Sequence, residues 1–487
     1  MATPSPRNPW VVLFSTSLAV FAVFLDTTIL FVAFPSISAD FSSVSTSALS
    51  WVLNAYTIVF AAALIPAGRL ADRIGRRRTF LGAVVVFTAA SILCGLAPNV
   101  GLLVAARILQ ALGAAALVPA SLALVLQTFP REKIPVAVAI WGAVGAVAGA
   151  AGPTLGALVV ENLGWRWAFF INLPVGIVSL FIGWRVLPEG REANPGRLPD
   201  PLGVVLLASG LALAAFAIVQ TESWGWASSG FLVTFGAAVI LIAVFLWRCS
   251  TVSNPLLDLS LFESRSFRWA NAGTLAFSVG FNAMFLGNVL FFTEVWRYSI
   301  LRAGLAISVG PLIVAVTAPL FGRLAGRIGQ RALLIPGGLV WAAGGALLIS
   351  TVERSPAYLT TYLPAVALTG LGVSLCLPQL SSASVQGLPP DRFGSGSAVN
   401  QAIRNLGGTF GVALVVAFLA VESPTDPLAG FHRVWWLLVL SGLSVSALSL
   451  LLPRRVTPQS TGAMEANARA RSIPASRSSV PEEPTST

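Results

Sequence analysis

The chain has 487 residues, of which 56% are apolar and only 10% are charged, and its formal net charge is +11. Soluble proteins average about 25% charged residues and cannot bury apolar side chains at this density, so the composition excludes a soluble protein. A membrane-spanning helix takes about 20 residues. The apolar content is therefore sufficient for many spans, which also excludes an enzyme held by a single anchor, and we expect an all-α integral membrane protein.

Apolar runs separated by polar residues, glycine or proline predict fourteen spans in chain order. They lie at about residues 10–35, 49–68, 79–97, 101–128, 135–157, 167–187, 201–221, 230–248, 269–293, 302–321, 332–351, 361–383, 397–420 and 434–452. An even number of spans places both termini on one side. Arginine accumulates in cytoplasmic loops, and most arginines fall on the side of the termini. We therefore predict a multi-pass protein of the cell (inner) membrane with both termini cytoplasmic.

Other compositional features exclude several classes of site. Cys94, Cys249 and Cys376 lie far apart and His432 is the only histidine, so the sequence predicts no disulfide and no metal site. The basic residues are spread between apolar runs rather than gathered into one stripe, so we expect no nucleic-acid partner. Residues 1–9 are predicted to be a cytoplasmic segment, and residues 453–487 are too poor in apolar side chains to fold.

An internal repeat predicts the organisation of the chain. Residues 68–77 read GRLADRIGRR and residues 322–331 read GRLAGRIGQR, eight identities in ten at a spacing of 254. Both segments are predicted cytoplasmic loops, so spans 1–6 would correspond to spans 9–14. The predicted organisation is a six-helix bundle at 10–187, a linker with two inserted helices at 188–268 and a second six-helix bundle at 269–452. Parallel halves of this kind are the plan of major facilitator transporters, which bind substrate between the halves.

Charged residues inside the predicted spans are the first candidates for function. Asp26 is the only carboxylate there, and burying its charge costs at least about 2.5–3.5 kcal/mol. A helix movement that changes its surroundings would bind or release a proton; the alternative is a structural partner for an arginine. Arg107 lies at a comparable depth, so a charge pair or a shared water network with Asp26 is possible; snorkelling toward the interface is the alternative. Arg404 lies in the inner third of span 13, where snorkelling toward the interface is the alternative.

Span 5 carries a regular series of glycines. The steps of 3, 4, 3 and 4 put all of them on one helical face, so another helix can approach closely along this seam, and Pro153 should bend the helix. Tight packing alone is one interpretation; closure of one side of a transporter is the other. The residues of this glycine seam are Gly142, Gly145, Gly149, Gly152, Pro153 and Gly156.

Two further groups are weaker candidates. Glu294 stands beside Trp296 and Arg297, which an interfacial aromatic belt with an i,i+3 charge pair explains; substrate contact is the alternative. Trp51, Asn54 and Tyr56 can line a cavity, although an aromatic residue in a span more often packs against other helices. The arginines at 76–78 are interpreted most simply as a determinant of topology.

Several motifs resemble those of the fourteen-span drug:proton antiporters of the major facilitator superfamily. The first span matches the pattern LDxTIxxVAxP of that branch from Leu25 to Pro35, and the fourth-span RxxqGxG motif is met at Arg107, Gln110 and Gly113, with Ala111 in place of a glycine. The fifth-span motif GPxxGG is met except for Ala157, and WRWAFFINLPVG (165–176) resembles a characteristic segment of the branch. The superfamily's loop motif, here called the gate motif, is matched at Gly68, Asp72, Arg73, Gly75, Arg76 and Arg77.

The resemblance implies a function and residue roles. Asp26 would be the proton site, Arg107 its relay partner, and Asp72 with Arg73 a cytoplasmic latch. We expect a monomeric exporter that exchanges protons for amphipathic or hydrophobic small molecules such as drugs, antibiotics or dyes, with the proton gradient as energy source and no cofactor. An exporter of lipid or glycolipid is the alternative. A membrane enzyme or a sensor without transport is a remote one, because no P-loop, HExxH or GxSxG motif occurs in a suitable context.

Overall fold

The computed structural model describes residues 8–130, 133–189, 200–389, 392–420 and 428–453, and in these residues all regular structure is helical. Short α-helical turns are α2 (Thr46–Leu49), α7 (Trp167–Phe170) and α10 (Thr221–Trp224). The 3-10 turn η2 (Leu259–Glu263) and the π-helical turns η3 (Phe291–Val295) and η4 (Tyr358–Tyr362) also occur. The long helices are α1 (Pro9–Asp40), α3 (Trp51–Ile74), α4 (Arg76–Gly95), α5 (Val100–Thr128), α6 (Ile134–Leu163), α8 (Asn172–Val186), α9 (Pro201–Val219), α11 (Ser229–Thr251), α12 (Arg265–Leu290), α13 (Ile300–Ile328), α14 (Gln330–Thr351), α15 (Leu363–Gln386), α16 (Phe393–Ala420) and α17 (Ala429–Ser449).

The number of candidate membrane spans agrees with the prediction. Thirteen of the described helices are long and apolar enough to cross a bilayer. The pair Val136–Gly149 and Ala151–Leu163, which together make up α6 and meet at 41°, supplies a fourteenth. The bend is expected, because Pro153 has no backbone N–H to donate to the carbonyl of Gly149. The chain is therefore a multi-pass membrane protein.

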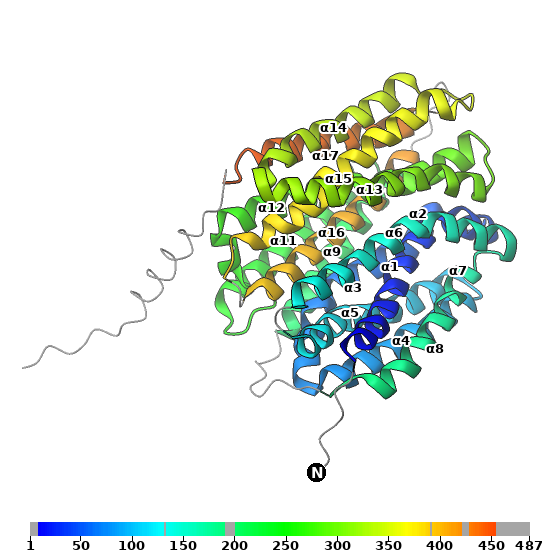
Figure 1. Cartoon of the computed structure of the whole chain (residues 1–487). Coiled ribbons are helices and arrows are strands. Elements are labelled where there is room, and N and C mark those ends of the chain that lie inside the picture. Colours follow the sequence, from blue (N-terminus) through cyan, green and yellow to red (C-terminus); the bar gives the residue numbers. More distant parts are fainter. Residues whose placement is uncertain (1–7, 131–132, 190–199, 390–391, 421–427, 454–487) are drawn as a thin grey trace, which may run out of the picture.

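The helices form two bundles with an equivalent arrangement (Figure 1). In the first, α1 packs on α5, α6 and α8, and α4 packs on α5 and α8; in the second, α12 packs on α15, α16 and α17, and α14 packs on α15 and α17. The repeat of 254 residues is visible in the backbone. Helix α3 ends before Gly75 (φ 123°) and α13 ends before Gly329 (φ 88°). Both positions need a left-handed backbone, which glycine adopts without strain.

The two repeat segments are not loops, contrary to the prediction. Residues 68–74 continue α3 and residues 322–328 continue α13, so that each connection to the next helix is a single glycine. Hydropathy marks the point at which a helix leaves the hydrocarbon rather than the point at which it ends. The Leu, Ala and Arg residues of the repeat favour helix in water as well.

The two bundles meet along two helix pairs, α6 with α13 and α3 with α16. The α6–α13 contacts lie at one end, where α1 ends and α13 begins, and we call this the predicted outer end. There the Glu161 carboxylate accepts a hydrogen bond from the backbone N–H of Leu301, and the hydroxyls of Thr154 and Ser308 are hydrogen-bonded. The rings of Phe31 (α1) and Phe285 (α12) lie 5.8 Å apart in the same region. Toward the opposite end α6 and α13 diverge (Figure 1).

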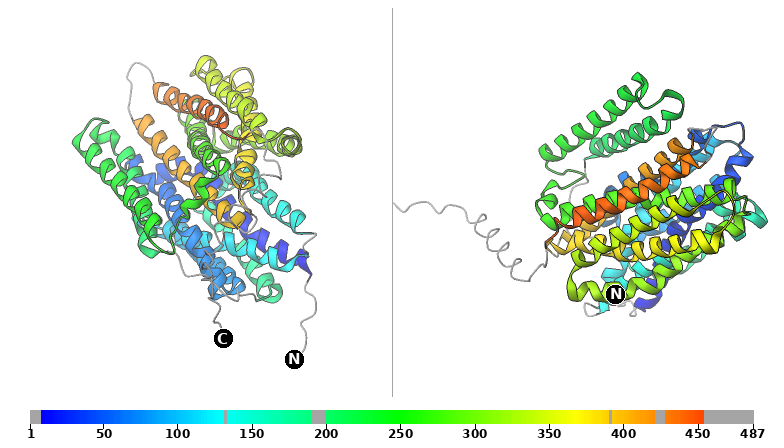
Figure 2. Two further views of the ribbon diagram at one scale, coloured as in Figure 1. Left: turned by 90° about the vertical axis from the view of Figure 1, so that its left-hand side faces the viewer. Right: turned by 90° about the horizontal axis from the view of Figure 1, so that it is seen from above.

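The inserted helices α9 and α11 form a hairpin on the outside of the bundles (Figure 2). Helix α9 packs against both α3 and α16, so it covers one of the two seams between the bundles, whereas α11 contacts mainly α9. Asp200 caps α9 by accepting from the N–H of Gly203 at 3.1 Å, and Arg248 of α11 donates to its carboxylate at 3.0 Å. The hydrogen bond from Arg248 lowers the pKa of Asp200 below its usual range. The predicted tail beyond residue 453 and most of the predicted segment 1–9 lie outside the described residues.

Candidate functional site

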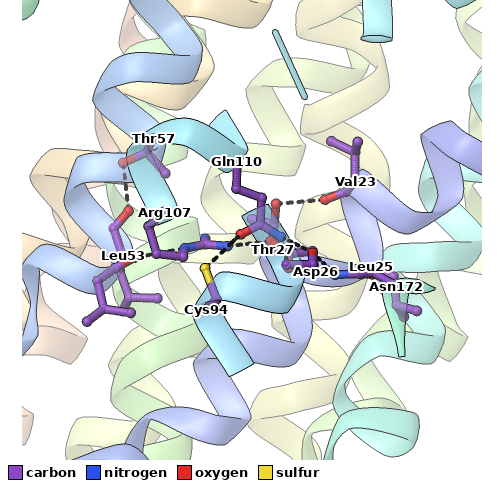
Figure 3. A network of polar contacts seen from close by, with 12 residues as sticks. Val23, Leu25, Asp26, Thr27, Leu53, Thr57, Cys94, Arg107, Gln110 and Asn172 are labelled. Atoms are coloured by element: carbon purple, nitrogen blue, oxygen red, sulfur yellow. Dashed lines mark hydrogen bonds and ion pairs between the residues drawn. The ribbon is translucent and has the colours of Figure 1, made fainter. Parts of the chain in front are cut away.

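Asp26 and Arg107 form a buried ion pair. Nη1 of Arg107 lies 2.6 Å from Oδ2 of Asp26, and each side chain is 1% exposed. Asp26 lies in the middle of α1, and Arg107 enters from α5 (Figure 3). The pairing that their similar depths made possible is thus present, whereas their role in proton coupling remains a prediction.

Further donors surround the carboxylate. Oδ1 of Asp26 accepts from Nε2 of Gln110 at 2.9 Å and from Nδ2 of Asn172 at 2.9 Å. Both amides also donate to the hydroxyl of Ser91, at 2.7 and 3.2 Å. Gln110 and Arg107 are three residues apart on α5 and therefore share one face. Asn172 comes into reach because it is the first residue of α8, after the break that separates α8 from α7.

The arginine is held on its other sides by α3 and by aromatic rings. Its Nε donates to the carbonyl of Val52 at 3.1 Å, and its Cζ lies 4.0 Å from the ring centroid of Tyr56 and 5.8 Å from that of Phe169. Nη1 also donates to Oε1 of Gln110 at 2.6 Å. Helices α1, α3, α4, α5 and α8 thus all contribute to one polar cluster inside the first bundle, which we call the acid cluster.

The arrangement suits an ionised carboxylate facing a cation. All three polar groups on Asp26 are donors, and Arg107 is always protonated. A buried ion pair adds little stability by itself, but loss of one partner leaves an uncompensated charge that is costly by several kcal/mol. Protonation of Asp26 would be such a loss. The cluster can therefore couple the arrival of a proton to a rearrangement of the helices that form it.

Sequence reasoning singled out only part of this cluster. Asp26 and Arg107 stood out as charges in apolar surroundings, and Gln110 belonged to a quoted motif. Asn172 lies within the quoted segment 165–176, but neither it nor Ser91 was assigned a role, because single hydroxyl and amide groups occur in many of the predicted spans. The remaining signal was the i,i+3 spacing of Ser91 and Cys94 on α4, which places both near Gln110; Sγ of Cys94 lies 3.7 Å from Oε1 of Gln110.

Arg404 is separate from the acid cluster, as its depth predicted. It is half-buried on α16, and its Nη2 donates to Oε1 of Gln401 at 2.5 Å. Within the described ranges no carboxylate lies within ion-pair distance of its guanidinium. The structure therefore places a cation without a counter-charge near the interface between the bundles.

The glycine seam allows a close approach of another helix, as the interpretation of tight packing expects, and that helix belongs to the same bundle. A Cβ at Gly152 would lie 1.9 Å from Oγ1 of Thr28, and Cβ atoms at Gly145 and Gly156 would contact Phe24 and Ile29. All three therefore face α1 of the same bundle. A Cβ at Gly142 or Gly149 would meet nothing within 4 Å. At about 100° per residue the seam is about 80° wide, and α1 covers only one of its edges.

Closure against the other bundle uses a neighbouring face of α6. There the close approach is provided by a glycine of α13: a Cβ at Gly304 would lie 2.4 Å from Cβ of Ala157 and 2.6 Å from the carbonyl oxygen of Pro153. The prediction that the glycines of α6 themselves close one side is therefore wrong for this arrangement of the bundles. The sequence indicated a small-residue contact but not which helix it served.

The gate motif is engaged within its own bundle. Asp72, in the last turn of α3, pairs at 3.1 Å with Arg76, the first residue of α4 beyond Gly75, and Nη2 of Arg77 donates to the carbonyl of Trp184 at 2.6 Å. Arg73 is exposed and forms no ion pair with any described residue. Asp72 and Arg73 thus do not join the two bundles in this arrangement, and their role as a latch remains a prediction. Gly68 packs against Pro119 of α5.

The weaker candidates separate into packing and surface positions. Trp51 packs against Phe216 of α9, with ring centroids 6.4 Å apart, and Asn54 is fully buried with Nδ2 near the hydroxyl of Ser50. Tyr56 belongs to the acid cluster. Glu294 is exposed in η3, and the predicted ion pair with Arg297 is not formed. The helix ends before Arg297, whose φ of 53° destroys the i,i+3 geometry.

In the described part of the chain no group of His, Cys, Asp or Glu side chains could hold a metal ion.

Two bundles of membrane helices with equivalent packing, joined by an inserted hairpin and holding one buried acid–arginine pair, define a membrane transporter built on two related halves. The family model described as Major Facilitator Superfamily matches residues 16–412 and 272–480. The chain belongs to this superfamily.

Individual relatives agree with this assignment. The chain is 35% identical over 415 residues, 85% of its length and 76% of the relative's, to the multidrug resistance protein Stp of Mycobacterium tuberculosis (strain CDC 1551 / Oshkosh). It is 34% identical over 405 residues, 82% of its length and 78% of the relative's, to the multidrug export protein EmrB of Haemophilus influenzae. Among solved structures, an auto-inhibited peptide transporter of the POT family has the same fold, with a TM-score of 0.66, 17% identity and coverage of 97% of this chain and 98% of that one.

Proposed function

We propose that this chain is an exporter of amphipathic or hydrophobic small molecules, driven by protons that enter in exchange. The observation that carries the proposal is the acid cluster, which encloses the single ion pair of Asp26 and Arg107 with each side chain 1% exposed. Two of the relatives, a multidrug resistance protein and a multidrug export protein, support the substrate class and the direction. The gradient itself is the energy source, so the cycle needs neither a cofactor nor a covalent step.

The acid cluster suggests how the proton acts. In the present arrangement the bundles are in contact at the predicted outer end, and Asp26 accepts hydrogen bonds from Arg107, Gln110 and Asn172. A proton on Asp26 would cancel the charge that compensates Arg107. Arrangements of α1 against α5 that solvate the arginine would then be favoured. Because a ligand shifts an equilibrium only through differential binding, the inward- and outward-facing arrangements must differ in affinity for this proton.

The topology belongs to the same proposal. The two repeat segments place Arg69–Arg78 and Arg323–Arg331 at the end of the bundles opposite the predicted outer end. Arginine-rich segments of this kind remain in the cytoplasm. Both termini would then be cytoplasmic, and one chain, with its two bundles, would form the complete transporter. Reporter fusions to each terminus test the orientation, and a reporter active outside would contradict it.

The decisive experiment replaces Asp26→Asn in the full-length chain, reconstituted in liposomes. Efflux of ethidium, an amphipathic cationic dye, is followed by fluorescence while a pH gradient is imposed. We expect gradient-driven transport to be abolished, because the neutral amide cannot exchange a proton. The matched control is Asp40→Asn, which also removes a carboxylate paired with an arginine, Arg166 at 2.9 Å, but at a half-exposed site. Undiminished gradient-driven efflux in Asp26→Asn would contradict the proposal.

A further inference from the structure

A pocket at the predicted outer end of the second bundle has no part in the proposed transport cycle. It has a volume of about 320 Å³ and lies between the first turns of α13 and the π-helical turn η4. Its walls include Tyr298, Arg302, Leu305, Val309, Tyr358 and Leu359. One cation, two phenol rings and an apolar wall thus meet in one place.

The cation is not neutralised by the protein. The guanidinium carbon of Arg302 stacks 3.9 Å from the ring centroid of Tyr298. Within the described residues no carboxylate lies within ion-pair distance of it, and the same holds for the exposed Arg297 and Arg354 in the adjoining loops. Nε1 of Trp296 donates to the carbonyl of Glu353 at 2.9 Å and ties these two loops together. The exposed carboxylates of Glu294 and Glu353 belong to the same loops, and the exposed Glu161 lies against the backbone N–H of Leu301, next to Arg302. Three cations and three carboxylates thus lie in this region, and none of the three cations is in an ion pair with a described residue.

The shape of the pocket is fixed by packed aromatic rings. Tyr298 stacks on Phe292 at 5.6 Å, and Phe292 lies 4.5 Å from Tyr362. The hydroxyl of Tyr358 donates to the carbonyl of Ala306 at 2.7 Å, which pins η4 to α13. Two π-helical turns and the left-handed Arg297 occur within this one region. Features of this kind concentrate at functional sites.

The apolar wall continues along the surface of α13. Leu305 is 52% exposed and Leu359 is 74% exposed. Leu312, Val316 and Leu320 are more than half exposed and, at steps of 7, 4 and 4 from Leu305, share its helical face. This face lies away from both helices that flank α13, since Gly304 and Ser308 face α6 and Gly310 and Thr317 face α15. From Leu305 to Leu320 the stripe is about 22 Å long, more than the depth of one leaflet, about 15 Å.

We propose that this pocket binds an anionic phospholipid of the leaflet at the predicted outer end. The phosphate accepts hydrogen bonds from Arg302, whose planar fork of donors matches phosphate geometry, and the acyl chains lie along Leu305, Leu312 and Val316. Arg297 and Arg354 are further cations without an ion-pair partner among the described residues, and they disfavour the quaternary ammonium group of a zwitterionic choline headgroup. A water-soluble anion would satisfy Arg302 but would leave the apolar wall uncovered.

The test is native mass spectrometry of the full-length protein in detergent, with equal amounts of dioleoyl phosphatidylglycerol and dioleoyl phosphatidylcholine. We expect one phosphatidylglycerol to be retained in preference to phosphatidylcholine. Arg302→Gln should lower that retention about tenfold, the usual effect of losing one charge-assisted hydrogen bond. Arg302→Lys keeps the charge and should retain most of the binding. The matched control is Arg433→Gln, which removes an exposed arginine at the same end but outside the pocket.

Each remaining outcome decides the proposal. Equal retention of both lipids by the unmodified protein would overturn the headgroup selectivity. Equal retention of phosphatidylglycerol by Arg302→Gln and Arg433→Gln would place the lipid elsewhere. Displacement of the lipid by inorganic phosphate alone would make a free anion the ligand and overturn the lipid assignment, whereas displacement only by excess phosphatidylglycerol would support it. None of these readouts depends on transport, so failure here leaves the proposed export function untouched.

Discussion

The two bundles share a backbone plan and differ in the chemistry of their interiors. Asp26 corresponds, 254 residues later, to Gly280. A Cβ at Gly280 would lie 2.1 Å from Oγ of Ser441, whose hydroxyl accepts from Nε1 of Trp341 at 2.9 Å. Where the first bundle holds an ion pair, the second is filled by a tryptophan–serine contact. The charge is therefore no requirement of the fold.

The buried polar contacts among the described residues of the second bundle are neutral, and its one intramembrane arginine contact, from Arg404 to Gln401, is only half-buried. Nδ2 of Asn400 donates to Oδ1 of Asn271 at 2.9 Å and to Oγ1 of Thr274 at 3.0 Å. Amide and hydroxyl groups of this kind hold membrane helices together without a charge that a proton can cancel. The buried ion pair on which the proposed proton step depends thus lies in the first bundle, and the corresponding position of the second bundle is neutral. The predictions below test that division.

The largest effect is expected when a carboxylate is introduced into the second bundle at the position that corresponds to Asp26. Gly280→Asp overpacks the contact with Ser441 and buries a charge without a cation, so the destabilisation should reach about 5 kcal/mol, the sum of the two costs. We expect no monodisperse protein on gel filtration. Gly326→Asp is the control, because it restores the acid of the first repeat segment at a position where a Cβ meets nothing within 4 Å. Normal behaviour of Gly280→Asp would contradict the division between the bundles.

The second prediction removes the cation of the acid cluster. Arg107→Gln leaves Asp26 without a counter-charge and should destabilise the protein by about 3–5 kcal/mol, measured as thermal unfolding in detergent. The double variant with Asp26→Asn has no charge left to compensate and should recover part of the loss. Arg166→Gln breaks an ion pair whose side chains are about half exposed, so its effect should stay below about 1 kcal/mol. Equal losses of stability in Arg107→Gln and Arg166→Gln would show that burial of the ion pair does not determine its contribution to stability.

The third prediction concerns packing in the first bundle. Gly152→Ala places a Cβ against Thr28 of α1 and should cost about 1–3 kcal/mol. Gly149→Ala, three residues earlier on the same predicted seam, meets nothing within 4 Å and should be neutral or slightly stabilising. Thermal unfolding of the two variants side by side provides the measurement. If both substitutions had the same effect, α1 would not be the partner of this seam.

The smallest effect on stability is expected at the gate motif. Asp72→Asn removes an ion pair with Arg76, across the turn at Gly75, whose side chains are 29% and 25% exposed, and ion pairs open to solvent contribute at most about 1 kcal/mol. Its thermal unfolding should therefore resemble that of the unmodified protein. The same variant also tests the proposed role of Asp72 as a cytoplasmic latch. A clear loss of efflux with unchanged stability would place Asp72 in the transport cycle, whereas unchanged efflux would remove it.

Patterns of one or two residue types predicted much of this architecture. Apolar runs predicted the spans because a helix in hydrocarbon must be apolar around its whole circumference. The repeat predicted equivalent positions in the two halves, and the structure has a left-handed glycine at the end of each repeated helix, Gly75 and Gly329. Asp26 and Arg107 stood out because charges are rare in such surroundings. The helical structure of the two repeat segments was not predictable from hydropathy. A helix can continue into water beyond the residue at which it leaves the hydrocarbon.

The sequence by itself thus determined which segments lie in the membrane and which lie in water. It also determined which residues, such as charges inside a span, are unusual in their surroundings. Only the tertiary structure decided the partners: that Asn172 and Ser91 complete the shell of Asp26, that the glycines of α6 face α1, and that Gly304 of α13 makes the approach between the bundles. The physical reason is that membrane helices have a nearly uniform apolar surface. Which faces meet is therefore set by the fit of small side chains and single hydrogen bonds. The spacing of the α6 glycines indicates a close contact, but no spacing along the chain indicates which helix is the partner.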